Sequence, residues 1–159
     1  MPNTIEHLAP GDLRPWARNA RTHCIKQLKQ LADSIQTFGF SNPVLIDQTN
    51  TILAGHGRVE AAKTLGLETV PCIRIEHITN AEKRAYVIAD NKLALNAGWD
   101  EELLAQELQG LLATENIGFD IGVIGFTGAE IATISGRSMR YMQNISRTTH
   151  RPDQPLNRG

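Results

Sequence analysis

The chain has 159 residues and a formal net charge of -1, with 41% hydrophobic and 21% charged residues. This composition is typical of a globular domain and excludes a collagen-like or disordered chain. No apolar stretch reaches the roughly 18 residues that span a bilayer, no secretory signal is visible, and two cysteines are too few for a disulfide framework. We therefore expect a soluble, cytoplasmic protein with reduced thiols and no membrane partner.

The first half of the chain predicts a helix followed by a β-hairpin. Residues 1–24 contain three prolines and a polar run, so we expect them to be irregular. Apolar residues at helical spacing predict a helix over 25–38, which Gly39 closes. Two short runs of strand-forming residues then predict a hairpin over 43–54, with a turn at 48–50.

The next elements are a short helix, a strand and a capped helix. Gly66 closes the short helix that follows the hairpin. Residues 70–75 predict a strand, and Pro71 places it at a sheet edge or at the start of the strand. Thr79 and Glu82 have the spacing of a capping box, which predicts a helix over about 80–95.

Further helices follow near residue 100. Acidic residues at its N-terminus favour a helix over about 101–113, and a second capping box opens a short last helix at residue 127. These helices show no clear helix-turn-helix pattern, so we expect no downstream DNA-binding domain. The predicted fold class is α+β, with a small mixed sheet, surrounding helices and a helical C-terminal extension.

Charge is unevenly distributed along the chain. Residues 1–135 hold 11 basic and 16 acidic groups, whereas residues 136–159 hold five arginines and one acid. This layout indicates either a solvated tail or a DNA-contacting tail, whose candidate residues are Arg137, Arg140, Arg147 and Arg151. We expect a domain over 1–135, with its core at about 5–98 and its helical extension at 99–135, followed by a basic, disordered tail over 136–159.

The strongest local pattern is a glycine-rich turn between a predicted strand and a predicted helix. Its residues are Gly55, His56, Gly57 and Arg58. Free amides at a helix N-terminus attract anions, and an arginine can bind a phosphate bidentately. A histidine adds a further donor. The pattern therefore favours a phosphate or nucleotide site, but it also fits a tight turn whose Arg58 is solvated or paired with an acid such as Glu60.

Five blocks in order make the chain resemble the N-terminal domain of the ParB/sulfiredoxin superfamily. They span about residues 5–130 and comprise Asn19-Ala20-Arg21, the segment 31–44, Gly55-His56-Gly57-Arg58 with Ala61-Ala62, the segment 65–71, and Asp90-Asn91. The segment around Asp90 is similar to a subgroup from phages and mobile elements, in which the domain often precedes a DNA methyltransferase.

The resemblance implies a nucleotide site. The residues matching the phosphate-binding box are Gly55, His56, Gly57 and Arg58, and Arg21 approaches the same site. Gly39, Asn42 and Pro43 match the block near the base, although ParB usually has Gln at the position of Asn42. Asp90 and Asn91 match a Glu-Asn pair that helps to hold the triphosphate and Mg²⁺, and they are our catalytic and metal candidates. The implied cofactors are Mg²⁺ and CTP or ATP.

The resemblance leaves several activities open. One is a nucleotide-binding module that acts in DNA transactions, with Mg²⁺-dependent hydrolysis and nucleotide-linked homodimerisation. Alternatives are a kinase for free serine, a ParB-like nuclease, and a non-catalytic DNA-targeting partner of a methyltransferase. His56 and Gly57 replace the usual Glu-Arg of ParB, the box has no sulfiredoxin cysteine, and the acids Asp47, Glu60 and Asp90 are scattered. The chain also lacks the Asn/Asp-Pro-Pro-Tyr/Phe motif of a DNA methyltransferase.

Overall fold

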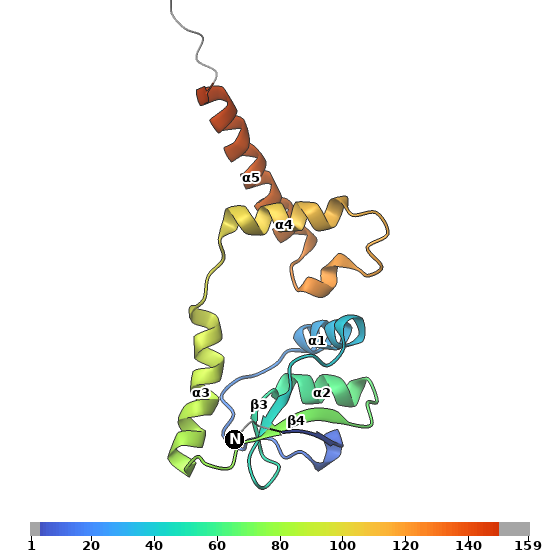
Figure 1. Cartoon of the computed structure of the whole chain (residues 1–159), viewed down its shortest axis with the longest axis vertical. Helices are drawn as coiled ribbons and strands as arrows, with labels where there is room; N and C mark the ends of the chain where they lie inside the picture. The colour runs from blue at the N-terminus through green and yellow to red at the C-terminus, as the bar shows by residue number, and fades with distance from the viewer. Residues whose placement is uncertain (1–3, 150–159) are drawn as a thin grey trace, which may run out of the picture. The chain divides into compact units, whose positions relative to one another are not determined.

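The computed structural model describes residues 4–149, and the chain divides into two compact units, residues 1–98 and 99–159 (Figure 1). Unit 1 contains β1 (Ile5–Leu8), η1 (Pro10–Asp12), α1 (Ile25–Phe38), β2 (Val44–Ile46), β3 (Ile52–Ala54), α2 (His56–Thr64), β4 (Val70–Arg74) and α3 (Asn80–Asn96). Unit 2 contains α4 (Glu101–Ala113), η2 (Ile121–Ile124) and α5 (Gly128–Thr149). The expected α+β class is confirmed.

The four strands form a mixed sheet in the order β1-β4-β2-β3. β2 and β3 are the predicted antiparallel hairpin, and β4 pairs in parallel with β2 and antiparallel with β1. Because β4 is an internal strand, the prediction of an edge position for it is wrong. Pro71 is the second residue of β4, which fits the alternative prediction of a strand start.

The first strand lies in a segment, residues 1–24, that was expected from the sequence to be irregular. β1 has only four residues, and its side chains alternate between exposed and half-buried. So short a segment carries a weak pattern of its own. Its partner, β4, lies far along the sequence, and Ile5 pairs with Ile73 in the register of the two strands. Pairing with the distant strand β4, rather than a pattern in the local sequence, therefore accounts for β1.

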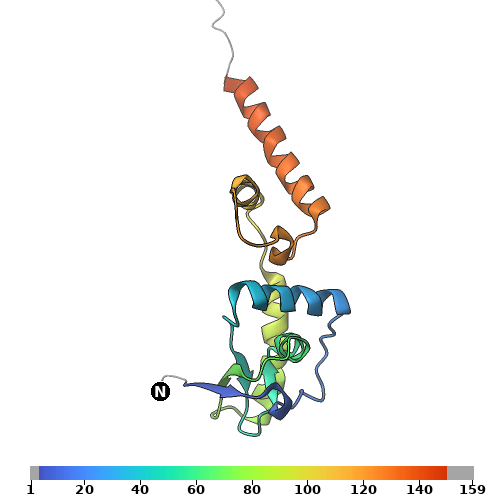
Figure 2. The same cartoon turned by 90° about the vertical axis from the view of Figure 1, so that its right-hand side faces the viewer.

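Helix α2 is buried on two sides, between α1 and the sheet (Figure 2). Val59 and Ala62 pack with strand residues in the main core, whereas Ala61 packs with Ala32 and Ile35 of α1. Small side chains suit this position because α2 must approach both neighbours closely. The burial fixes the place of the α2 N-terminus, where the glycine-rich turn lies.

A buried ion pair attaches α3 to the β2–β3 turn. Lys83 Nζ lies 2.9 Å from Asp47 Oδ2, and the two residues are only 8% and 4% exposed. Asp47 Oδ1 also accepts hydrogen bonds from the Thr49 amide and hydroxyl and from the Thr51 amide. Burial opposes ionisation of Asp47, but the Lys83 ammonium and these donors together hold its pKa well below the usual range.

Unit 2 is helical, and its last helix is longer than expected. Ala105 and Leu108 of α4 and Ile131 of α5 are buried, and Trp99 contacts Phe126 with ring centroids 5.8 Å apart. α5 begins after a capping box formed by Thr127 and Glu130 and continues through residue 149. α5 thus includes residues 136–149, for which the sequence predicted a disordered tail, and residues 150–159 lie outside the described part. None of the described helices is long and apolar enough to cross a membrane.

The Lys83–Asp47 pair gives the first prediction. Lys83→Met leaves a buried carboxylate without its cation, so we expect the free energy of unfolding to fall by about 3–5 kcal/mol. Urea denaturation measures this loss. The matched control is Lys29→Met, which removes an exposed pair with Asp33 and should cost at most about 1 kcal/mol. Equal losses in the two variants would contradict the importance of the buried pair.

Candidate functional site

The turn between β3 and α2 requires a glycine at its first position. Gly55 has φ 101°, in the left-handed region, and is the residue before α2. A Cβ there would also lie 2.9 Å from Arg58 Nη2. Gly55 thus lets the chain turn sharply from the strand into the helix while the Arg58 side chain folds back over the turn.

The second glycine allows close packing at the same helix end. A Cβ on the buried Gly57 would lie 2.8 Å from Leu31 Cδ1 and 3.0 Å from His23 Cε1. A larger residue would push α1 and the His23 ring away from the start of α2. The amides of the first turn of α2 have no intrahelical partners, because the helix hydrogen bonds begin with the Val59 amide and the Gly55 carbonyl.

Arg58 is half-buried, and only some of its hydrogen-bond donors have partners. Its Nη2 donates to the Pro43 carbonyl at 3.2 Å, while its buried Nε has no partner among the described residues. Burial lowers the pKa of Arg58, and the charge of Asp90 opposes this shift. Glu60 bonds Lys63 at 2.8 Å, so the Arg58–Glu60 pair that the sequence left open is absent here. Arg58 thus keeps one buried donor without a partner among the described residues.

His56 is held as a neutral ring. Its Nε2 accepts a hydrogen bond from the Trp16 amide at 3.1 Å. An accepting Nε2 carries no proton, so the proton of the neutral ring lies on Nδ1. Burial lowers the pKa of His56, and the nearby His23 lowers it further. The donor that was expected of His56 from the sequence is therefore Nδ1–H alone.

These residues line one cavity of about 460 Å³. The predicted residues reach it from four stretches of unit 1: the segment before α1, the segment before β2, the start of α2 with the turn before it, and the middle of α3. Nine of the ten residues predicted for phosphate, base and metal line this cavity, namely Arg21, Asn42, Pro43, Gly55, His56, Gly57, Arg58, Asp90 and Asn91. Gly39 is not among the lining residues and instead caps the C-terminus of α1. A cavity of this size, with arginines and free helix amides, can bind a small anionic ligand.

Of the two metal candidates, Asp90 fits Mg²⁺ better. Both polar atoms of the Asn91 amide are engaged, since Oδ1 accepts from Arg21 Nη1 at 2.9 Å and Nδ2 donates to the Val87 carbonyl at 2.8 Å. Mg²⁺ is commonly held by one or two carboxylates together with substrate phosphates. Within the described residues no three His, Cys, Asp or Glu side chains form a metal-binding group. Asp90 could therefore hold Mg²⁺ only together with a phosphate ligand.

Sequence reasoning missed three polar residues that line the cavity. They are His23, Gln27 and Tyr86. His23 Nδ1 lies 3.1 Å from Gln27 Oε1, one helical turn further on. Tyr86 precedes Asp90 by four residues on α3, so helical spacing could have identified it. Burial and the Asp90 charge both raise the pKa of Tyr86, which keeps its phenol protonated.

The four arginines predicted to contact DNA do not all lie in an irregular tail. Arg137 and Arg140 are exposed on α5, and Arg137 forms a weak surface pair with Glu101 at 3.7 Å. Arg147 also belongs to α5. Arg151 lies outside the described residues. A regular helix thus carries three of the four arginines.

Two family models match the chain. One, described as the ParB N-terminal domain, matches residues 2–92, which is more than half of the chain. The other, described as the ParB-methyltransferase HTH domain, matches residues 102–153. The second match contradicts our expectation that the helices after residue 100 form no helix-turn-helix and that a downstream DNA-binding domain is missing.

Individual relatives agree with these matches. The ParB-like nuclease domain-containing protein YnaK of Escherichia coli is 49% identical over 73 residues, covering 46% of this chain and 84% of YnaK. The probable chromosome-partitioning protein ParB of Vibrio cholerae is 28% identical over 154 residues, covering 94% of this chain. The chain spans only 47% of the length of that protein.

A solved structure shares the fold. It is the C-terminally truncated chromosome-partitioning protein ParB from Caulobacter crescentus complexed with CTP-gamma-S. The match has a TM-score of 0.66 at 22% identity and covers 82% of this chain and 76% of that chain. The resemblance inferred from five ordered sequence blocks is confirmed.

The environment of His56 gives the second prediction. Its folded-state pKa is lowered, so the unfolded chain binds a proton first as the pH falls. The free energy of unfolding should therefore decrease below the unfolded-state pKa of about 6.5, until the pH passes the folded-state pKa. His56→Gln offers an acceptor that does not titrate and should flatten this dependence in urea denaturation. The exposed His77→Gln is the control, and equal slopes for wild type and His56→Gln would contradict the assignment.

Proposed function

The chain belongs to the ParB N-terminal domain family, and on this premise we propose that unit 1 binds a nucleoside triphosphate, CTP, and that unit 2 binds DNA. The protein would then be a nucleotide-dependent DNA-binding module in a process related to partition or to DNA modification. Support for CTP comes from the CTP-gamma-S complex of the Caulobacter relative. Support for DNA comes from the helix-turn-helix match and from the partition relatives.

The observation that carries the nucleotide proposal is the unsatisfied Arg58 Nε beside the α2 N-terminus. A buried donor without a partner costs free energy, and native proteins rarely keep one unless a ligand or water completes it. Here the donor belongs to a cation, Arg58, which lines the same cavity as the start of α2. A phosphate oxygen would satisfy Arg58 and the first-turn amides together.

The other cavity residues then have distinct roles. Arg21 supplies a second cation for the phosphates and is held in position by Asn91. Asn42, which is exposed at the cavity edge, can donate to and accept from the edge of a base. Pro43 contributes through its carbonyl, which positions the Arg58 guanidinium. Asp90 would hold Mg²⁺ against the phosphates, and the metal would neutralise their charge.

The acids of unit 1 do not favour a nuclease. Asp47 is buried against Lys83, and Glu60 is paired with Lys63. Of the three acids considered from sequence, Asp90 alone lines the cavity. A two-metal nuclease needs several convergent carboxylates. Nucleotide binding therefore accounts for the cavity better than phosphodiester cleavage does.

Nucleotide binding gives the third prediction. At a concentration of 100 times its Kd, CTP with Mg²⁺ should stabilise the wild type by about 2.7 kcal/mol, which appears as a rise in Tm. Arg58→Ala should abolish the rise, and Arg58→Lys should reduce it because a lysine cannot bind bidentately. Arg84→Ala is the control, since this exposed arginine does not line the cavity. A rise that Arg58→Ala leaves intact, or no rise with CTP, ATP or GTP, would overturn the proposal.

DNA binding gives the fourth prediction. The affinity of the full chain for a short DNA duplex should fall with salt, because each neutralised phosphate releases counterions. The double variant Arg140→Ala/Arg147→Ala should bind more weakly and lower the slope of log K against log salt by about 0.9 for each phosphate that it no longer neutralises. Fluorescence anisotropy measures both. The control, Arg14→Ala/Lys26→Ala, removes two exposed cations of unit 1, and an equal effect in both variants would contradict a role for α5.

A further inference from the structure

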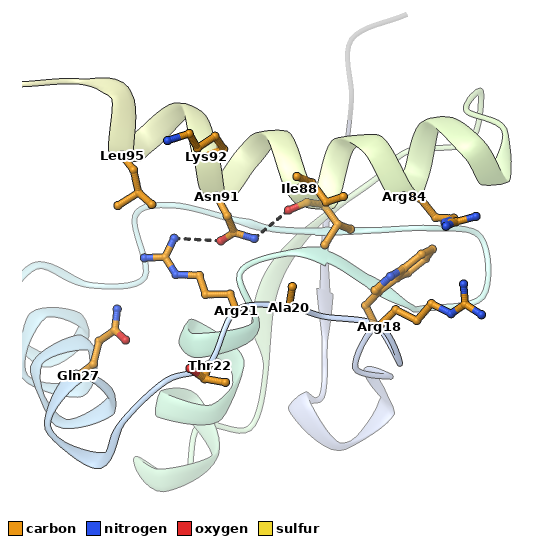
Figure 3. A pocket seen from close by; sticks show the side chains of 12 residues that line it. Arg18, Ala20, Arg21, Thr22, Gln27, Arg84, Ile88, Asn91, Lys92 and Leu95 are labelled. Atoms are coloured by element: carbon orange, nitrogen blue, oxygen red, sulfur yellow. Dashed lines mark hydrogen bonds between the residues drawn. The ribbon is translucent and has the colours of Figure 1, made fainter.

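A second cavity of about 590 Å³ lies between α3 and the segment that precedes α1 (Figure 3). We call it the α3 groove. Its lining comes from residues 16–27 on one side and from α3 on the other: Trp16, Arg18, Ala20, Arg21, Thr22, Gln27, Arg84, Val87, Ile88, Asn91, Lys92 and Leu95. Arg21 and Asn91 also line the proposed nucleotide cavity, but the other α3 residues of the groove do not.

The α3 side of the groove is apolar and uncovered. Ile88 is 65% exposed and Leu95 is 70% exposed, although both are large aliphatic residues. In its first half α3 is held to the unit by the buried Lys83 and Val87, whereas residues 92–96 are all exposed. Exposed large aliphatic residues in the lining of a cavity, framed by polar residues, favour a binding surface.

The charges around the groove are all of one sign. Figure 3 shows Arg84 and Arg18 toward one end and Lys92 and Arg21 toward the other, with Ile88 between them. None of the 12 lining residues is acidic. An occupant therefore needs an apolar centre and negative charge near both ends.

We propose that the α3 groove binds a short acidic peptide segment of another protein, whose aliphatic side chains contact Ile88 and Leu95. The lining residues of α3 run from Arg84 to Leu95, which corresponds to about 16 Å of helix. This length suits a peptide better than a single small molecule. The acidic residues of the peptide would pair with the cations at both ends, and its aliphatic residues would cover the exposed apolar centre.

The same features disfavour other occupants. A second copy that presented this groove symmetrically would bring two sets of four cations together, which is repulsive. Single-stranded nucleic acid usually stacks its bases on several aromatic side chains, and Trp16 is the one aromatic residue in the lining. An aliphatic centre between cations fits acidic peptides with leucine-like side chains best.

Selection from a random peptide library displayed on phage tests the proposal with the 159-residue chain. We expect the enriched peptides to combine aliphatic residues with flanking Asp or Glu. In fluorescence anisotropy with an enriched peptide, Ile88→Ser and Arg84→Glu should each weaken binding by roughly tenfold or more, and added salt should weaken it further. Both substitutions are at exposed positions, so the fold should persist.

The matched controls are an exposed aliphatic residue and an exposed arginine that do not line the groove. Leu93 is 65% exposed on the same helix, and Arg14 is exposed in unit 1, so Leu93→Ser and Arg14→Glu should leave peptide binding unchanged. The CTP-induced rise in Tm should persist in Ile88→Ser, which separates this proposal from the nucleotide site.

Four outcomes would overturn the proposal. The first is a failure to enrich any peptide, and the second is an enriched sequence without acidic and aliphatic residues. The third is equal binding by groove and control variants. The fourth is a different occupant: oligothymidylate binding that Ile88→Ser and Arg84→Glu abolish, or a wild-type dimer in light scattering that the same variants dissociate.

Discussion

The site depends on the burial of α2 between α1 and the sheet. A helix buried on two sides cannot shift along either neighbour without breaking close packing. Val59 and Ala62 fix α2 against the strands, and Ala61 fixes it against α1. Gly57 also helps to fix the position of α2, because its lack of a side chain lets Leu31 and His23 approach the start of the helix. The free amides and Arg58 are therefore presented at a fixed place, without help from a ligand.

The opposite wall of the cavity, α3, is held by two polar contacts in addition to the packing of the buried Val87. The Lys83–Asp47 pair joins the start of α3 to the β2–β3 turn, and the Arg21–Asn91 hydrogen bond joins the middle of α3 to the segment before α1. The first contact is buried and costly to break, whereas the second is only part-buried. We infer that the α3 wall adjusts more readily than the α2 wall when a ligand binds.

The nucleotide cavity and the α3 groove differ in chemistry although they share Arg21 and Asn91. The nucleotide cavity is lined by glycines, helix amides and Arg58, which suit compact phosphate charge. The α3 groove offers exposed Ile88 and Leu95 among cations, which suits an extended amphipathic partner. Both would bind anionic ligands, but they would recognise them by different means.

The sequence by itself determined the elements whose signals are local. The periodicity of residues 25–38, the capping boxes at Thr79 and Thr127, and the glycine-rich turn predicted helices and a turn that the structure contains. Only the tertiary structure decided the internal position of β4, the existence of β1, and the partners of Arg58, His56 and Lys83. These features depend on contacts between residues far apart in sequence, and local propensity carries no information about which distant segment will supply the partner.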